Sequence, residues 1–104
     1  MTRPHFVVRL RLLGASEGGR RQPIFSGYRP QAWFGETTAD GTRLVHGVQV
    51  ELLDRASLEP GNEANATLTP FFPELWPRRT VGDQIPIYEG RSHVADAVIS
   101  EVNL

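Results

Sequence analysis

The side chains that could support catalysis are scattered along this 104-residue chain. His5, His46 and His93 are far apart, and no His-x-x-x-His pair, Gly-x-Ser-x-Gly elbow or phosphate-binding loop accompanies them. The twelve carboxylates follow no spacing that selects an acid–base pair, and the absence of cysteine excludes a thiolate metal site and a cysteine nucleophile. The sequence therefore predicts a non-catalytic protein without a metal or a cofactor.

Residues 18–34, GGRRQPIFSGYRPQAWF, carry the densest set of chemically distinctive side chains. The segment holds three glycines, two prolines, three arginines and four aromatics. Guanidinium groups bind carboxylates and phosphates through paired hydrogen bonds, so Arg20, Arg21 and Arg29 are candidates for contacts with a partner. Arg20 and Arg29 are equally suited to fix loops to barrel carbonyls or to Glu36, and both interpretations stay open.

The backbone of this segment is predicted to form a strand, a structured loop and the start of a second strand. Gly18-Gly19 predicts a tight turn and Ser26-Gly27 a second bend, because glycine adopts positive φ without a steric penalty. Residues 28–34 are predicted as a strand, and Pro30 places it at a sheet edge or a bulge because proline offers no donor to the ladder. Trp33 and Phe34 should then point to opposite faces, one buried and the other exposed or covered by a loop.

Alternating hydrophobic residues predict strands along the rest of the chain. These strands cover residues 5–13, 45–53, 64–70, 85–88 and 94–102, with turns at Asp40-Gly41, Pro60-Gly61 and Glu89-Gly90. Residues 71–83 are expected to form a long irregular loop rich in proline and aromatics. Six or seven short strands without a convincing helix indicate an antiparallel barrel or a sandwich.

Length and composition indicate one domain spanning residues 1–104. The formal net charge of −1 gives no bulk attraction to nucleic acid or to anionic lipid. No apolar run approaches membrane-spanning length, and the start of the chain lacks a secretory apolar region. We therefore expect a cytoplasmic protein that does not associate with membranes.

The segment 18–34 resembles the signature of the third, C-terminal β-barrel domain of bacterial translation elongation factor Tu. The matching residues are Gly18, Gly19, Arg20, Pro23, Ile24, Phe25, Ser26, Gly27, Tyr28, Arg29, Pro30, Gln31, Trp33 and Phe34. The resemblance continues more weakly over residues 6–102, at Pro60-Gly61, Leu68 to Pro70 and Ile87 to Gly90. It implies a six-stranded antiparallel closed β-barrel with two lengthened loops, between Gly41 and Pro60 and between Pro70 and Ile85.

The resemblance also implies binding residues. In that family the domain contacts the T-stem of aminoacyl-tRNA, and Gln31 and the pair Glu89-Gly90 stand at positions that approach the tRNA backbone. Three departures should weaken such binding. Asp40 replaces a threonine, Thr69 replaces a basic or imidazole residue, and in Gly90-Arg91-Ser92 the arginine of the family's Gly-Gly-Arg hairpin is displaced by one position. A negative charge near expected phosphates lowers affinity because phosphate contacts dominate it.

These observations lead us to expect a binding module that carries no GTPase domain and binds no nucleotide by itself. The preferred hypothesis is a translation-associated or protein-interaction role through Arg20, Arg21, Arg29 and Gln31, with an unidentified protein partner. The alternative is direct tRNA or RNA binding, which predicts an electropositive stripe linking Arg20, Arg29 and Arg91. A third hypothesis, a small enzyme in the lengthened loops, requires a histidine and a carboxylate inside a pocket.

A second candidate surface lies in the predicted loop 71–83. Trp76, between Leu75 and Pro77, is predicted to plug one end of the barrel. Alternatively, Trp76, Arg78 and Arg79, together with Phe71 and Phe72, form an aromatic–basic surface suited to stacking or protein contact.

Overall fold

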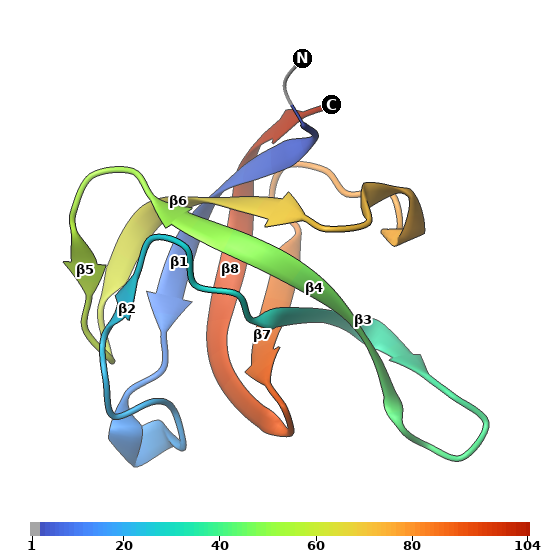
Figure 1. Ribbon diagram of the computed structural model, residues 1–104, viewed down its shortest axis with the longest axis horizontal. Helices are drawn as coiled ribbons and strands as arrows, with labels where there is room; N and C mark the ends of the chain where they lie inside the picture. The colour runs from blue at the N-terminus through green and yellow to red at the C-terminus, as the bar shows by residue number, and fades with distance from the viewer. Residues whose placement is uncertain (1–2) are drawn as a thin grey trace.

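The computed structural model describes residues 3–104 and is built almost entirely of antiparallel strands (Figure 1). The main sheet contains β1 (His5–Leu12), β3 (Gln31–Thr37), β4 (Arg43–Leu52), β6 (Glu63–Pro70), β7 (Gln84–Glu89) and β8 (Ser92–Asn103). They pair in the order β1-β6-β4-β3-β7-β8, and β8 returns to pair with β1, so the sheet closes into a barrel. The prediction of an all-β antiparallel architecture is confirmed.

Two short strands and two 3-10 helices lie outside the main sheet. The strands β2 (Ile24–Phe25) and β5 (Ser57–Leu58) form a separate two-stranded sheet, and β5 was not predicted from the sequence. Two 3-10 helices, η1 (Ala15–Glu17) and η2 (Pro73–Leu75), lie in the loops after β1 and β6. No helix within residues 3–104 has the length and apolarity needed to cross a membrane.

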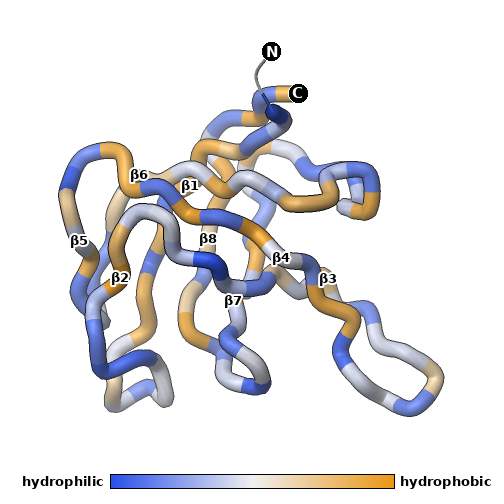
Figure 2. Tube along the Cα trace, in the orientation of Figure 1, coloured by the Kyte–Doolittle hydropathy of each residue, from blue (hydrophilic) through white to orange (hydrophobic). Residues whose placement is uncertain are grey.

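Alternate side chains of each strand fill the barrel interior. In β1, Val8, Leu10 and Leu12 are fully buried, whereas Arg9 between them is exposed, as the alternating pattern predicted. Figure 2 shows the same alternation of hydrophobic and hydrophilic residues along β4. The interior is thus a packed core and holds the strand ends, where loops gather, in fixed positions.

Strand β8 departs from the simple alternation. Val94 and Ala95 are both buried although they are adjacent, whereas from Ala95 to Ser100 the alternation is regular, with Ala97 and Ile99 buried and Val98 exposed between them. The pairing of β7 with β8 shifts register between Ile87 and Tyr88, and such a bulge lets two successive residues face the same side. A strict period of two cannot anticipate this shift.

The strand predicted from Tyr28 to Phe34 begins three residues later, at Gln31, and continues to Thr37. Residues 28–30 still follow β4, because Tyr28 and Val50 form an isolated bridge and the carbonyl of Pro30 accepts a bond from Val48 N at 3.1 Å. Pro30 therefore lies just outside the regular ladder, as expected for a residue without a donor.

Two segments project from the barrel in Figure 1, the β3–β4 hairpin and the β6–β7 loop. The β3–β4 hairpin turns at Thr38–Thr42, and Gly41 adopts the positive φ of +86° that the Asp40-Gly41 pair predicted. The β6–β7 loop, residues 71–83, carries η2 and is the long irregular loop expected there. The two ends of the described chain lie side by side, since His5 pairs with Asn103.

Candidate binding surfaces

Two residues of the signature region, Arg20 and Tyr28, form one hydrogen-bonded cluster with Glu89. The Arg20 Nη1 group donates to both carboxylate oxygens of Glu89, at 2.7 and 2.8 Å, and the Tyr28 hydroxyl donates to Glu89 Oε1 at 2.7 Å. The Arg20 guanidinium also lies 5.1 Å from the centre of the Tyr28 ring. The cluster ties the loop before β3 to the end of β7 and neutralises the charge of Arg20 within the chain.

The pKa values of both hydrogen-bond donors in this cluster, Arg20 and Tyr28, are raised. Burial by itself would lower the pKa of Arg20, but its hydrogen bond to Glu89 and the charge of Glu89 outweigh burial, so the net shift is upward. Burial raises the pKa of Tyr28, and the bond to Glu89 raises it further. Both donors therefore remain protonated at neutral pH, and the cluster stays assembled.

The glycine pair before Arg20 has two separate roles. Gly18 ends η1 with φ of +86°, as the predicted turn requires. Gly19 is needed for space, because a Cβ at this position would lie 2.4 Å from the carbonyl oxygen of Leu13. The close approach of the two backbones brings the chain past the end of β1 and leads it to Arg20.

Arg20 and Arg29, for which the sequence allowed the same two roles, have different contacts in the structure. Arg20 binds Glu89 and the carbonyls of Gln22 and Pro23, so its predicted loop-fixing role is confirmed, but its carboxylate partner is Glu89 and not Glu36. The Arg29 guanidinium lies 5.6 Å from the centre of the Phe71 ring. Arg20 is therefore occupied within the chain, whereas Arg29 is exposed and forms no ion pair among residues 3–104.

The other predicted binding residues remain at the surface. Gln31 is half-buried at the start of β3, where it pairs with Gly47 of β4 and Tyr88 of β7. Arg21 and Arg91 are exposed, and within residues 3–104 neither forms an ion pair. Of the positive stripe expected from Arg20, Arg29 and Arg91, Arg20 is paired with Glu89, and Arg29 and Arg91 are exposed without an ion pair in the described chain.

Arg91 lines a cleft of about 570 Å³ between the β3–β4 hairpin and the β7–β8 turn. The facing wall carries Arg43, whose guanidinium lies 5.2 Å from the Trp33 ring centre and 4.8 Å from that of Tyr88. Asp40 also lines the cleft, and hydrogen bonds from Thr38 and Thr42 lower the pKa of its carboxyl. Arg43 was not singled out in the sequence because its aromatic neighbours come from other strands.

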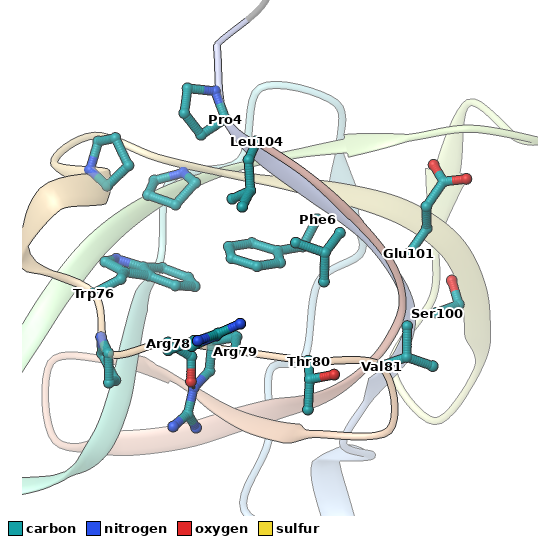
Figure 3. A pocket seen from close by; sticks show the side chains of 14 residues that line it. Pro4, Phe6, Trp76, Arg78, Arg79, Thr80, Val81, Ser100, Glu101 and Leu104 are labelled. Atoms are coloured by element: carbon teal, nitrogen blue, oxygen red, sulfur yellow. The ribbon is translucent and has the colours of Figure 1, made fainter.

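A groove of about 670 Å³ lies at one end of the barrel, between the β6–β7 loop and the paired ends of β1 and β8 (Figure 3). Phe6 and Trp76 stack at its centre, with ring centres 5.3 Å apart and planes inclined by 13°. Trp76 also packs against Phe34 in a T-shaped contact, with ring centres 4.8 Å apart. Trp76 is therefore the predicted plug, and Phe34 is one of the residues that it covers.

The same loop supplies the predicted aromatic–basic surface. Arg78 and Arg79 lie along one side of the groove, and Ser100 and Glu101 lie on the other (Figure 3). Arg79 pairs with Asp83 at 3.7 Å and lies 5.3 Å from the Phe34 ring centre, whereas Arg78 is exposed and has no ion pair among the described residues. The two interpretations of Trp76 are thus compatible, because the plug forms the floor of the surface.

The β6–β7 loop, which forms one side of this groove, exposes large apolar side chains, of which Val81 lines the groove itself. Phe72, Leu75 and Val81, all in the β6–β7 loop, are 62%, 61% and 62% exposed. Elsewhere on the barrel, exposed residues such as Phe25 and Leu53 lie on different connections. An apolar patch rimmed by polar groups is typical of a protein interaction site.

Two of the three histidines, His46 and His93, each meet a single carboxylate without forming an enclosed site. His93 Nε2 lies 2.8 Å from Asp96 Oδ1, and His46 Nε2 lies 3.7 Å from Glu36 Oε1. Neither histidine lines the two hollows described above or the small cavity of about 290 Å³ beside Arg21. No group of three or more potential metal ligands gathers within residues 3–104.

No protein-family model matches this sequence. Its function must therefore be inferred from the chemistry of these surfaces, of which the groove of Phe6 and Trp76 is the largest and most apolar.

Proposed function

We propose that this chain is a non-catalytic protein-interaction module of the elongation factor Tu third-domain type, and that the groove of Phe6 and Trp76 is its interface. The observation that carries the proposal is a groove with an aromatic floor, lined in part by exposed Val81, on a loop that also exposes Phe72 and Leu75. Burial of such side chains is the main favourable contribution to protein association.

The composition of the groove supports a protein partner. Interfaces are enriched in aromatic residues and arginine, and their energetic centres combine a buried aromatic anchor with a polar rim. Trp76 supplies the aromatic group, and Arg78 supplies a cation without an internal partner among the described residues. Arg20, favoured from the sequence, is already bound to Glu89 and offers less to a partner.

A translation-associated role rests on the resemblance of residues 18–34 to the elongation factor. The six-stranded antiparallel barrel supports that relation, as does the cluster in which signature residues Arg20 and Tyr28 bind Glu89. The β6–β7 loop, which forms the groove, is one of the two connections that are longer than the family pattern. The interface would thus be a feature of this chain added to an inherited barrel.

Photocrosslinking in cells tests the proposal. Val81 is replaced by p-benzoylphenylalanine, and a matched variant carries the same group at Leu53, which is 54% exposed and lies on the β4–β5 connection. We expect a discrete protein adduct from position 81, absent from position 53 and reduced by Trp76→Ala. Equal adducts from both positions, or none from position 81, would contradict the assignment of the groove.

Direct tRNA binding is a second candidate, favoured by the cleft that brings Arg43 and Arg91 together. If it is correct, binding of tRNA weakens as salt rises, and Arg43→Ala and Arg91→Ala each lower the salt slope by about one. Arg55→Ala is the matched control, because Arg55 lies on the β4–β5 connection beside Asp54. Absence of binding to both aminoacylated and deacylated tRNA at low salt would exclude this candidate.

A further inference from the structure

We infer that the partner of the groove is a second copy of this chain, in a two-fold dimer in which the β6–β7 loop of each protomer fills the groove of the other. This inference rests on the proposed function and specifies its partner. Three properties of the loop support a second copy as the partner: its shape, its apolar side chains and its unpaired charges.

The loop contains a projecting apolar knob, which we define as residues 72–75. Figure 1 shows η2 standing away from the barrel wall, and Phe72 and Leu75 are both more than three-fifths exposed. The turn is held by backbone bonds from Leu75 N to Phe72 O at 3.0 Å and from Trp76 N to Pro73 O at 3.1 Å. A preformed knob loses little conformational freedom when it docks, so its burial is not offset by ordering of the loop.

The groove adjoins the knob: Pro73 belongs to both, and the groove continues along residues 76–81 and across to the ends of β1 and β8. Its floor is Phe6 and Trp76, and its walls include Pro77 and Val81. Two apolar side chains of the size of Phe72 and Leu75 need a hollow of this kind. In a two-fold symmetric interface both protomers use the same surface patch. A two-fold axis that passes beside the β6–β7 loop therefore places the knob of each protomer over the groove of its partner.

Two charged side chains fix how the knob of one protomer is oriented in the groove of its partner. Glu74 is exposed on the knob and Arg78 is exposed at the rim of the groove. Within residues 3–104 neither forms an ion pair, although they are only four positions apart. Arg79 is not available in the same way because it pairs with Asp83. In the dimer, Glu74 of one protomer pairs with Arg78 of its partner, and symmetry repeats the pair.

The test is sedimentation velocity of the purified chain over a concentration series, with a charge-exchange cycle. We expect a concentration-dependent species of about twice the 11.6 kDa chain mass. Glu74→Arg and Arg78→Glu should each raise the dimer dissociation constant about 10- to 30-fold, because each change acts twice in a symmetric interface. The double variant, Glu74→Arg with Arg78→Glu, should restore dimerisation. Leu53→Glu is the surface control and should leave it unchanged.

A chain that sediments as a monomer at all concentrations would overturn the inference, as would a double variant no better than the single ones. Circular dichroism of each single variant shows that it is folded, so that its loss of dimer is attributed to the interface. The crosslink from position 81 separates this inference from the proposed function. An adduct of twice the chain mass supports the dimer, whereas a monomeric chain with an adduct to a different protein retains the interface and refutes the second copy.

Discussion

Replacing Arg20 by alanine should destabilise the fold, whereas replacing its neighbour Arg21 should not. The Arg20 side chain is 24% exposed and its partner Glu89 is 37% exposed, so their pair is partly shielded from water. Arg21 is exposed and forms no ion pair within the described residues. The two adjacent arginines therefore form a matched pair that differs in internal contacts and not in charge.

The size of the effect follows from the hydrogen bonds that the Arg20 guanidinium donates. A buried hydrogen bond to a charged group contributes about 1.5–3 kcal/mol, and solvent screening at this partly exposed site reduces the Glu89 contribution to about 1–2 kcal/mol. The bonds from Arg20 to the Gln22 and Pro23 carbonyls, at 3.2 and 3.4 Å, are long and add about 0.5 kcal/mol. Arg20→Ala should thus lower the free energy of unfolding by about 2 kcal/mol and the midpoint temperature by about 10 °C.

Urea unfolding followed by tryptophan fluorescence measures this difference. Arg21→Ala should stay within about 0.5 kcal/mol of the wild type. A double-mutant cycle of Arg20→Ala with Glu89→Ala should give a coupling free energy of about 1–2 kcal/mol. Equal stability of the Arg20→Ala and Arg21→Ala variants, or a coupling near zero, would show that the cluster does not hold the loop to β7 and would make Arg20 a candidate for partner binding again.

Three other features of the fold can be tested by substitution. Gly19→Ala should cost more than about 2 kcal/mol in urea unfolding, because its Cβ would lie 2.4 Å from the carbonyl oxygen of Leu13, whereas Gly14→Ala, whose nearest contact is 3.4 Å, should be nearly neutral. Trp76→Ala should cost about 2–3 kcal/mol because its aromatic packing is removed, and a smaller loss in the same assay would argue against its role as a plug. Because the folded-state pKa of Tyr28 is raised, its contribution to stability is complete below the unfolded value of about 10 and is lost as pH rises beyond that value. Alkaline titration by ultraviolet difference absorbance should show a late tyrosinate fraction that Tyr28→Phe removes, and an unchanged titration curve in that variant would refute the assignment.

Most of the strands were predictable because their pattern is local. The alternation of Val8, Leu10 and Leu12 in β1 and of Val48, Val50 and Leu52 in β4 is the direct signature of a strand with one buried face. The turns at Gly41 and Gly61 were equally predictable, because both adopt the positive φ that glycine tolerates. The short strand β5 was missed because two residues are too few to show a period.

The candidate site was predictable only in part. The sequence drew attention to Trp76, Arg78 and Arg79 by composition, but it left open whether Trp76 was a plug or a surface residue. The structure gives it both roles, since it stacks on Phe6 and also lines the groove. Phe6 was not predicted to belong to a binding site, because in the sequence it is one apolar residue of the strand predicted over residues 5–13.

The sequence by itself determined the strands, the turns and the residue types available for binding, because these depend on neighbours within a few positions. Only the tertiary structure decided which charges are free. Arg20 and Glu89 are 69 positions apart and bind each other, whereas Glu74 and Arg78 are four apart and do not. The partner of a charged side chain is set by the pairing of distant strands and by the path of the loops between them, and no local pattern in the chain encodes that pairing.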